Sequence, residues 1–400
     1  MRILCVGNRF PPWSAGGYEV SWSGAVAALR TAGVAVRVLT TVPDPSDQSR
    51  EPAADGVHRE LRWYWRNHEF PAIGLRARAQ LERANASTLA RHISSFAPDA
   101  LMWWAMGGLS LSLLEQARRL GLPAVAVVGD DWLVYGPDVD RWTRMWRGPA
   151  RPAAQIAERL VGVPARLEID RAGRWAFNSQ YTLATARAAG WRLAEATVIH
   201  PGVDPTLFAA REPGPWQWRL LYCGRIDARK GIATAVEALL QLPPEATLTV
   251  HGEGDSGHTR ELAELATRLD LGDRVRFQRS PHEAVPAVYA SADAVVFPVK
   301  WREPWGLVPL EAMAIGRPVL ATCAGGGVAE YLRDDHNCLQ FHPGDAAALA
   351  KQLQRLAADG KLRDALRAAG RTTAARFTTD GFHSGLQREL EAAVASRRSP

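Results

Sequence analysis

Lysine is scarce in this chain of 400 residues, where it occurs only at positions 230, 300, 351 and 361. The formal net charge is nevertheless +6, because arginine is frequent. Such a mild excess permits attraction to phosphates but does not require a nucleic-acid partner, and we expect none. The shortage of lysine also argues against a phosphorylase, which would hold pyridoxal phosphate on a lysine. Lys230 stands out because it is the only lysine in the first 299 residues.

Cysteine and long apolar runs are also few. Cys5, Cys223, Cys323 and Cys338 are far apart and show no metal-type pairing, which favours a reduced, cytoplasmic compartment. No run of eighteen apolar residues occurs, so we expect no stable membrane insertion. The residues 1–7 predict a first strand and not a signal peptide, because they lack a separate charged region and a cleavage site.

Two ligand-binding patterns are missing. No Gly-x-Gly-x-x-Gly sequence follows the first strand, which argues against a dinucleotide cofactor. The second half of the chain has no Asp-x-Asp pair to hold a metal ion, since Asp334 and Asp335 are adjacent. We therefore expect neither a cofactor nor a metal ion.

The chain is long enough for two domains. Apolar strand patterns and helical patterns alternate in both halves, which is typical of an α/β protein with parallel sheets covered on both sides. Strands are expected over 2–7, 34–41, 99–104, 123–129, 174–179, 197–204, 218–224, 246–252, 274–277, 294–298, 318–322 and 337–341. Helices are expected over 18–31, 75–95, 111–120, 232–242, 285–290, 345–358, 362–369 and from about 379 to 394. Residues 42–73 are expected to be irregular, residues 136–170 to be an excursion with one helix, and residues 211–216 to be a linker.

The stretch 299–320 holds two carboxylates around the start of one helix. Glu303 comes first, seven residues follow, and Glu311 lies near the first turns of the helix, with Gly306 between them. Free backbone N–H groups and partial positive charge at a helix N-terminus suit an anion. We expect a phosphate-binding site here, with carboxylates beside it that can grip hydroxyl groups.

Other loops after predicted strands carry charged or small residues. Arg225 and Lys230 follow the strand 218–224, so both could face one diphosphate, although two surface cations would show the same spacing. Gly16 and Gly17 would let backbone N–H groups approach a phosphate or sugar, or they form only a tight turn.

These motifs together resemble those of the nucleotide-sugar glycosyltransferases of family 4, which retain the anomeric configuration and have the GT-B fold. The matching sequences are Glu303 to Glu311, Gly224-Arg225 to Lys230-Gly231, Gly252 to Gly254, Gly325 to Glu330, and Gly202-Val203-Asp204. The resemblance covers nearly the whole chain. It implies two Rossmann-like domains that face each other across a cleft: an acceptor-binding domain over 1–205 and a donor-binding domain over 206–378. A last helix, about 379–396, packs back on the first domain.

The resemblance also assigns roles. Arg225 and Lys230 would bind the donor diphosphate and stabilise the leaving group, Glu303 would hold a hydroxyl of the donor sugar, and Glu311 would take the ribose hydroxyls. The backbone near Arg279 would hold the nucleobase. The remaining donor-binding residues implied are Gly16, Gly17, Trp305, Gly306, Leu307 and Val308.

The sequence departs from the family at the loop after the strand 123–129. This loop usually carries a His-Asp pair, whereas here it reads Asp130-Asp131-Trp132. Either acid could orient an acceptor hydroxyl or accept its proton. A plain helix cap is at least as good an explanation for one of them.

The implied activity is retaining transfer of a hexose from a nucleoside-diphosphate sugar to a hydroxyl group of a small soluble acceptor. A lipid-linked or polysaccharide acceptor remains an alternative, as does a nucleotide-sugar epimerase. A catalytically inactive nucleotide-sugar-binding protein is the alternative from another class, since the usual histidine is missing. We expect a cytoplasmic monomer or weak homodimer.

Overall fold

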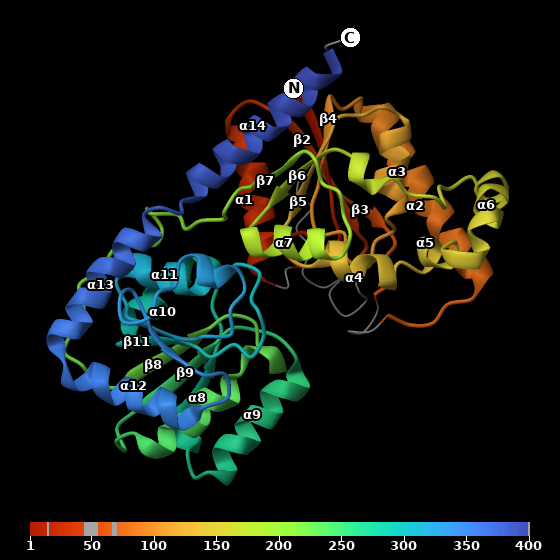
Figure 1. Ribbon diagram of the computed structural model, residues 1–400. Helices are drawn as coiled ribbons and strands as arrows, with labels where there is room; N and C mark the ends of the chain where they lie inside the picture. The colour runs from red at the N-terminus through yellow and green to blue at the C-terminus, as the bar shows by residue number, and fades with distance from the viewer. Residues whose placement is uncertain (14–15, 44–54, 66–69, 399–400) are drawn as a thin grey trace. The chain divides into compact units, whose positions relative to one another are not determined.

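The computed structural model describes residues 1–13, 16–43, 55–65 and 70–398 (Figure 1). The chain forms two compact units: unit 1 comprises Met1–Ile199 and His383–Pro400, and unit 2 comprises His200–Phe382. Each unit contains one parallel sheet with helices around it. This confirms the predicted fold class of two Rossmann-like α/β domains. The chain was expected to divide after residues 205 and 378, whereas the contacts divide it after 199 and 382.

The sheet of unit 1 has seven strands in the order β3-β2-β1-β4-β5-β6-β7. Its strands are β1 Arg2–Val6, β2 Ala35–Thr41, β3 Val57–Leu61, β4 Ala100–Trp103, β5 Ala124–Val128, β6 Arg174–Phe177 and β7 Ala196–Val198. Its helices are α1 Gly17–Thr31, α2 Leu75–Phe96, α3 Ser112–Arg119, α4 Trp132–Val139, α5 Arg141–Met145, α6 Ala154–Val161 and α7 Gln180–Ala188, and most of α14 Thr379–Arg398 also belongs to it. Glu389 of α14 accepts a hydrogen bond from Arg174 of β6 at 2.6 Å.

The sheet of unit 2 has six strands in the order β10-β9-β8-β11-β12-β13. Its strands are β8 Arg219–Cys223, β9 Thr247–His251, β10 Val275–Gln278, β11 Ala294–Phe297, β12 Val319–Thr322 and β13 Leu339–Phe341. Its helices are α8 Ile232–Ala238, α9 Ser256–Arg268, α10 Val285–Ser291, α11 Leu307–Ile315, α12 Ala346–Ala358 and α13 Gly360–Ala374. The strand order reverses between β8 and β11, and ligands of such sheets bind outside the carboxyl ends of the strands at this point.

Both faces of the unit 2 sheet are buried. Leu220 and Tyr222 of β8 lie in one hydrophobic cluster, whereas Leu221 and Cys223 lie in another. Successive side chains of a strand point to opposite faces, so the two clusters cover opposite sides of the sheet. This explains why the strands appear in the sequence as continuous apolar runs without alternation.

The structure corrects three expectations about local elements. Strand β3 lies inside the segment 42–73 that was expected to be irregular, of which 44–54 and 66–69 lie outside the described residues. The excursion 136–170 contains the second half of α4, the helices α5 and α6 and a 3₁₀ turn at Gly148–Ala153, where one helix was expected. Helix α9 was not predicted at all. Strand β3 reads Val-His-Arg-Glu-Leu and is recognisable only through its pairing with β2, because edge strands need no apolar pattern.

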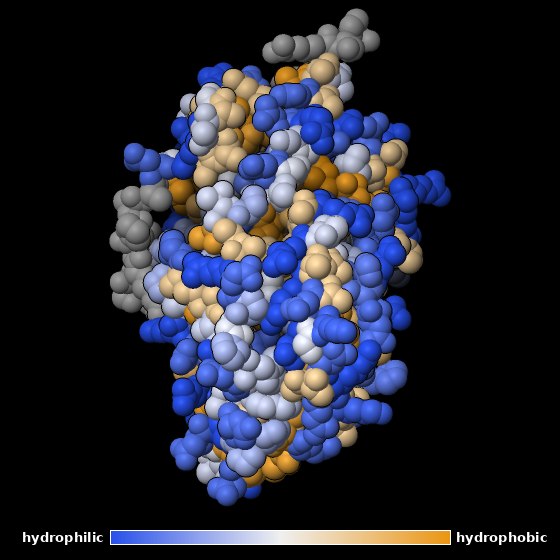
Figure 2. Space-filling view, turned by 90° about the vertical axis from the view of Figure 1, so that its left-hand side faces the viewer, coloured by the Kyte–Doolittle hydropathy of each residue, from blue (hydrophilic) through white to orange (hydrophobic). Residues whose placement is uncertain are grey.

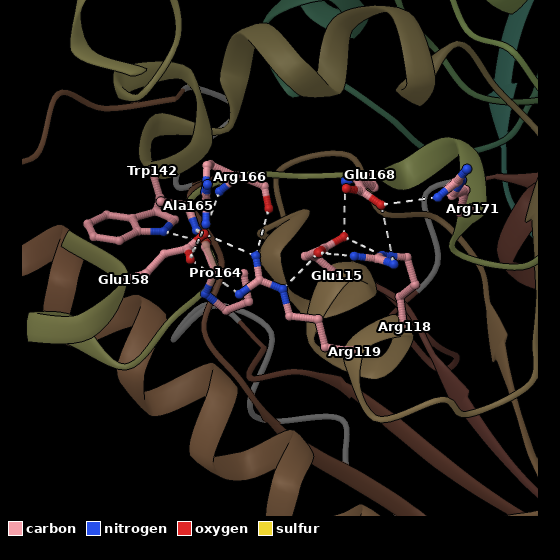
Figure 3. A network of polar contacts seen from close by, with 10 residues as sticks. All are labelled: Glu115, Arg118, Arg119, Trp142, Glu158, Pro164, Ala165, Arg166, Glu168 and Arg171. Atoms are coloured by element: carbon pink, nitrogen blue, oxygen red, sulfur yellow. Dashed lines mark hydrogen bonds and ion pairs between the residues drawn. The ribbon is translucent and has the colours of Figure 1, made fainter. Parts of the chain in front are cut away.

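Ion pairs connect this excursion to α3 (Figure 3). Glu158 of α6 accepts hydrogen bonds from Arg119 at 3.0 Å and from the backbone N–H of Ala165 at 2.9 Å. Glu115 is almost fully buried and accepts from both Arg118 and Arg119. Arg119 therefore bridges two carboxylates, and charge-assisted contacts of this kind position α6 on the rest of unit 1.

Among the described residues, no helix combines the length and apolar character needed to cross a membrane. Hydrophilic residues make up most of the face shown in Figure 2, and apolar residues are interspersed among them. The large apolar side chains lie mainly in the cores of the two units.

Candidate active site

Loops at the carboxyl edge of the unit 2 sheet are joined to one another by backbone contacts. Ile226 after β8 bridges Gly254 after β9, and Glu303 after β11 bridges Gly326 after β12. Gly326 has φ 94°, and a Cβ atom there would lie 2.4 Å from the carbonyl oxygen of Glu303. Only glycine permits this approach. The contact holds the backbone of Glu303 at the edge of the sheet.

The carboxylate of Glu303 is held by two donors. Lys230 Nζ lies 2.7 Å from Oε2, and the indole N–H of Trp301 donates to the same oxygen at 2.8 Å. The Lys230 and Glu303 side chains are only 14% and 13% exposed, so this ion pair is poorly screened by solvent. Arg229 lies over the Trp301 ring, 4.6 Å from its centroid. The structure thus joins two predicted site residues that are 73 positions apart.

Arg225 pairs with a neighbouring acid. Its guanidinium lies 3.0 Å from Asp227, which also accepts the backbone N–H of Arg229. Burial tends to raise the pKa of Asp227, but the hydrogen bonds and charges of Arg229 and Arg225 outweigh it and lower that pKa. Burial raises the pKa of Tyr222, and the charges of Asp227 and Glu303 raise it further, so these groups share one neighbourhood.

Glu311 lies in the second turn of α11. The hydroxyl of Tyr289, from α10, donates to Glu311 Oε2 at 2.6 Å. Burial raises the pKa of Glu311, although the bond from Tyr289 opposes that shift. Helix α11 begins after Gly306, which has φ 77° and provides no side-chain cap. The first-turn N–H groups at Leu307 and Val308 therefore have no side-chain cap among the described residues, which leaves them suited to an anion.

Trp305 and Arg279 are placed differently from the other predicted donor-site residues. The Trp305 side chain is 3% exposed, donates to the Pro201 carbonyl at 2.9 Å and stacks on His200. It is a core residue of unit 2, so only its backbone is in a position to meet a ligand. Arg279 is exposed and pairs with Glu253 of the adjacent loop at 2.9 Å.

Asp130 and Asp131 follow β5 in unit 1. Asp130 accepts the backbone N–H of Trp132 at 3.2 Å and the hydroxyl of Tyr135 at 2.9 Å. It thus performs part of the capping that was considered as an alternative role. Asp131 occupies the N-cap position of α4 without a side-chain cap bond, and its Oδ1 is buried without a hydrogen-bond partner among the described residues.

The environment of these acids favours protonation. Burial raises the pKa of Asp130 to about 6, while hydrogen bonds from Tyr135 and Trp132 oppose the shift. Burial also raises the pKa of Asp131. A carboxylate with a pKa near neutrality can accept a proton and release it again, which is the property that a general base requires.

Gly16 and Gly17 mark the start of α1. Gly16 has φ 169°, which is extended backbone that any residue adopts, and a Cβ atom there would meet no described atom within 4 Å. Gly17 is the first residue of the helix. The described part of the structure therefore shows open space at Gly16 but no steric need for glycine there.

Comparison with known proteins adds the family. Residues 15–207 match the family model described as Glycosyltransferase Family 4, and residues 207–373 match the model described as Glycosyl transferases group 1. The chain is 30% identical over 386 residues to the glycogen synthase of Mycobacterium tuberculosis, which covers 90% of this chain and 86% of that protein. The chain belongs to family 4 of the glycosyltransferases. It is a glycosyltransferase of the hexosyltransferase class.

Shorter matches join this glycosyltransferase to a second group of relatives. It is 34% identical over 234 residues to the D-inositol 3-phosphate glycosyltransferase of Stackebrandtia nassauensis, and the match covers 51% of each chain.

Solved structures agree on the GT-B fold. Anabaena HepE in complex with UDP has a TM-score of 0.72 at 21% identity, over 98% of this chain and 100% of that one. The sucrose-phosphate synthase of Thermosynechococcus elongatus has a TM-score of 0.71 at 22% identity, over 98% and 99% of the two chains.

Three residues of the candidate site were not assigned from the sequence. Trp301 and Asp227 lie within the motifs that the sequence analysis quotes or spans, but nothing in the sequence showed which groups they bind. Tyr289 lies in a separate helix, 22 residues before Glu311, and had no signal beyond its helical spacing.

Proposed function

We propose that this glycosyltransferase moves a hexose from a nucleoside-diphosphate sugar to a hydroxyl group of a small soluble acceptor, with retention of the anomeric configuration. The observation that carries the proposal is the arrangement of Lys230, Glu303 and Arg225 around the carboxyl edge of the unit 2 sheet. Two cations and a fixed carboxylate at that edge suit a diphosphate and a sugar hydroxyl. HepE, a protein of the same fold, has been crystallised with UDP-glucose, which supports a donor of this class.

The reaction requires that a diphosphate leave the anomeric carbon of the donor sugar. Negative charge grows on the departing phosphate, and cations or N–H groups already in place there lower the barrier. Lys230, Arg225 and the first-turn N–H groups of α11 would supply that stabilisation. Glu303 would hold a sugar hydroxyl beside the developing positive charge at the anomeric carbon. Glu311 would accept the ribose hydroxyls.

The acceptor hydroxyl would be oriented by the acids of unit 1. Asp131 has a buried oxygen without a partner among the described residues, whereas both oxygens of Asp130 already accept hydrogen bonds. Asp131 is therefore the better candidate for direct contact, and Asp130 for support. The departing phosphate can take up the acceptor proton, so the missing histidine does not prevent turnover.

A donor panel tests the proposal. The enzyme is incubated with UDP-, ADP- and GDP-linked hexoses and a mixture of small hydroxylated acceptors. Release of free nucleotide together with a glycosylated product supports transfer, and NMR of the product anomeric proton reads the configuration. Donor binding without release of free nucleotide, whichever acceptor is present, would favour a catalytically inactive nucleotide-sugar-binding protein and overturn the proposal. An inverted product would overturn retention alone.

A glucan acceptor is the second candidate. It rests on the similarity to a glycogen synthase over 86% of that protein. Elongation of malto-oligosaccharides, followed by mass spectrometry, would favour this candidate over a small acceptor.

The proposal includes neither a cofactor nor a metal ion at the donor site, and it places the enzyme in the cytoplasm as a monomer or weak homodimer. EDTA should leave kcat/KM for the donor unchanged within about twofold. A tenfold loss that Mg²⁺ or Mn²⁺ restores would show that a metal takes part.

A further inference from the structure

Three potential metal ligands gather in unit 1, and none of them belongs to a motif described above. His58 and Glu60 are two residues apart on β3 and therefore lie on the same face of that strand. His92 belongs to α2, which packs beside β3. The two imidazole rings meet edge to face with their centroids 4.7 Å apart.

The ligand atoms are close to the spacing that one metal ion requires. His58 Nδ1 lies 3.6 Å from Glu60 Oε1, and His92 Nε2 lies 3.5 Å from Glu60 Oε2. One ligand atom of each residue lies within 4.8 Å of the others. Tetrahedral zinc with bonds of about 2.0–2.1 Å places its ligand atoms about 3.3 Å apart. Small side-chain movements would therefore complete the coordination.

A buried nitrogen in this group lacks a hydrogen bond. His92 is 2% exposed, and its Nε2 is buried without a hydrogen-bond partner among the described residues. Such a polar atom is unfavourable unless something satisfies it.

Two arginines face the same group and limit the choice of ion. Arg91 pairs with Glu60 Oε2, but its side chain is 58% exposed and can swing into solvent. Arg37 approaches His92 Nδ1 at 3.4 Å and donates to Ser95 at 2.9 Å. Arg37 can keep its hydrogen bond to Ser95 when Nδ1 of His92 carries a proton and no longer accepts one. An ion that gains little from nitrogen ligands would not overcome this positive charge.

We propose that His58, Glu60 and His92 form a binding site for a divalent transition-metal ion of the zinc type. The ion would take one oxygen and two imidazole nitrogens from the protein, and water would fill the remaining position. Because the ligands come from the edge strand β3 and from α2, the bound ion would fasten that edge to the helix beside it. The site serves the stability of unit 1 and takes no part in the transfer reaction.

The test uses the full chain, purified without a polyhistidine tag and stripped with a chelator. Zn²⁺ should bind with one-to-one stoichiometry in calorimetry and should raise Tm in a concentration-dependent manner, whereas Mg²⁺ should not. Co²⁺ should give the visible absorption of a tetrahedral ion. Failure of Zn²⁺ to bind, or an equal effect of Mg²⁺, would overturn the proposal.

Two variants locate the ion. His58→Ala and Glu60→Gln alter partly exposed side chains and should each weaken Zn²⁺ binding at least tenfold. His342→Ala is the matched control, because that exposed imidazole lies 3.3 Å from the Cys323 thiol and offers another pair of ligands. It should leave the affinity unchanged. Unchanged affinity in His58→Ala, or loss of binding in His342→Ala, would show that the ion binds elsewhere.

Discussion

Lys230 Nζ lies 2.7 Å from Oε2 of Glu303, and the pair is largely shielded from water. Each residue therefore sets the position of the other. The ammonium carries one positive charge that a diphosphate would compete for, and the carboxylate keeps a second donor in Trp301 when the ammonium turns away. The ion pair therefore connects Lys230, which would stabilise the leaving diphosphate, to Glu303, which would hold a hydroxyl of the donor sugar.

Lys230→Ala should lower kcat/KM for the donor by about 10²- to 10³-fold, the usual cost of removing one charged contact to a developing anion, about 2.7–4 kcal/mol. Lys230→Arg should recover little of this lost activity, because a planar guanidinium cannot take the place of the compact ammonium beside Glu303. Lys351→Ala, at an exposed position of α12, is the control and should turn over donor normally. Wild-type rates in Lys230→Ala would show that the donor phosphate lies elsewhere.

Glu311→Gln should weaken donor binding and leave the fold intact. The amide keeps an oxygen that can accept from Tyr289, but it loses the charge that a pair of ribose hydroxyls would meet. We expect KM for the donor to rise about tenfold or more, with a small change in Tm. Tyr289→Phe provides the comparison, since it removes the supporting bond while the carboxylate stays. An unchanged donor KM in Glu311→Gln would argue against ribose contact.

The acids of unit 1 predict a pH dependence. Asp130 accepts hydrogen bonds at both of its oxygens, an arrangement that suits the ionised carboxylate, and burial raises its pKa to about 6. The kcat/KM for the acceptor should therefore fall as the pH drops below about 6. Asp130→Asn should abolish this inflection, whereas Asp138→Asn on the exposed side of α4 should keep it. The same inflection in Asp130→Asn would assign it to another group.

Glu82 predicts a pH-dependent stability of unit 1. Its carboxyl is fully buried, accepts from Tyr64 and Ser112, and has a pKa raised to about 8 by burial and by the charge of Asp140. The folded pKa exceeds the ordinary value of 4.5, so this stabilisation is complete below pH 4.5 and is lost as the pH rises through about 8. Each pKa unit corresponds to about 1.4 kcal/mol.

Glu82→Gln stays neutral at every pH and should lose less stability than the wild type between pH 5 and 8. Thermal unfolding at several pH values measures the difference, with the exposed Glu245→Gln as the control. A difference in Tm between Glu82→Gln and the wild type that does not change with pH would show that Glu82 ionises normally in the folded protein.

Several features of this enzyme could be predicted from local patterns. The strands β1, β2 and β8 are short apolar runs that end in glycine or polar loops, so periodicity alone located them. The motif around Lys230 and Glu303 was recognisable because its residues occupy fixed intervals after such strands. Helix α9 and strand β3 were not predicted, because their sequences are largely polar and their burial depends on neighbours from other parts of the chain.

Sequence alone determined the α/β class, the order of most elements and the residue types available at the strand ends. Only the tertiary structure decided which of them meet. Lys230 pairs with a carboxylate 73 residues away, and Trp305 turns into the core. Asp131 keeps an oxygen without a partner among the described residues, whereas both oxygens of Asp130 accept hydrogen bonds. Such outcomes depend on how separate loops converge at the edge of each sheet, and that convergence is set by packing between distant segments.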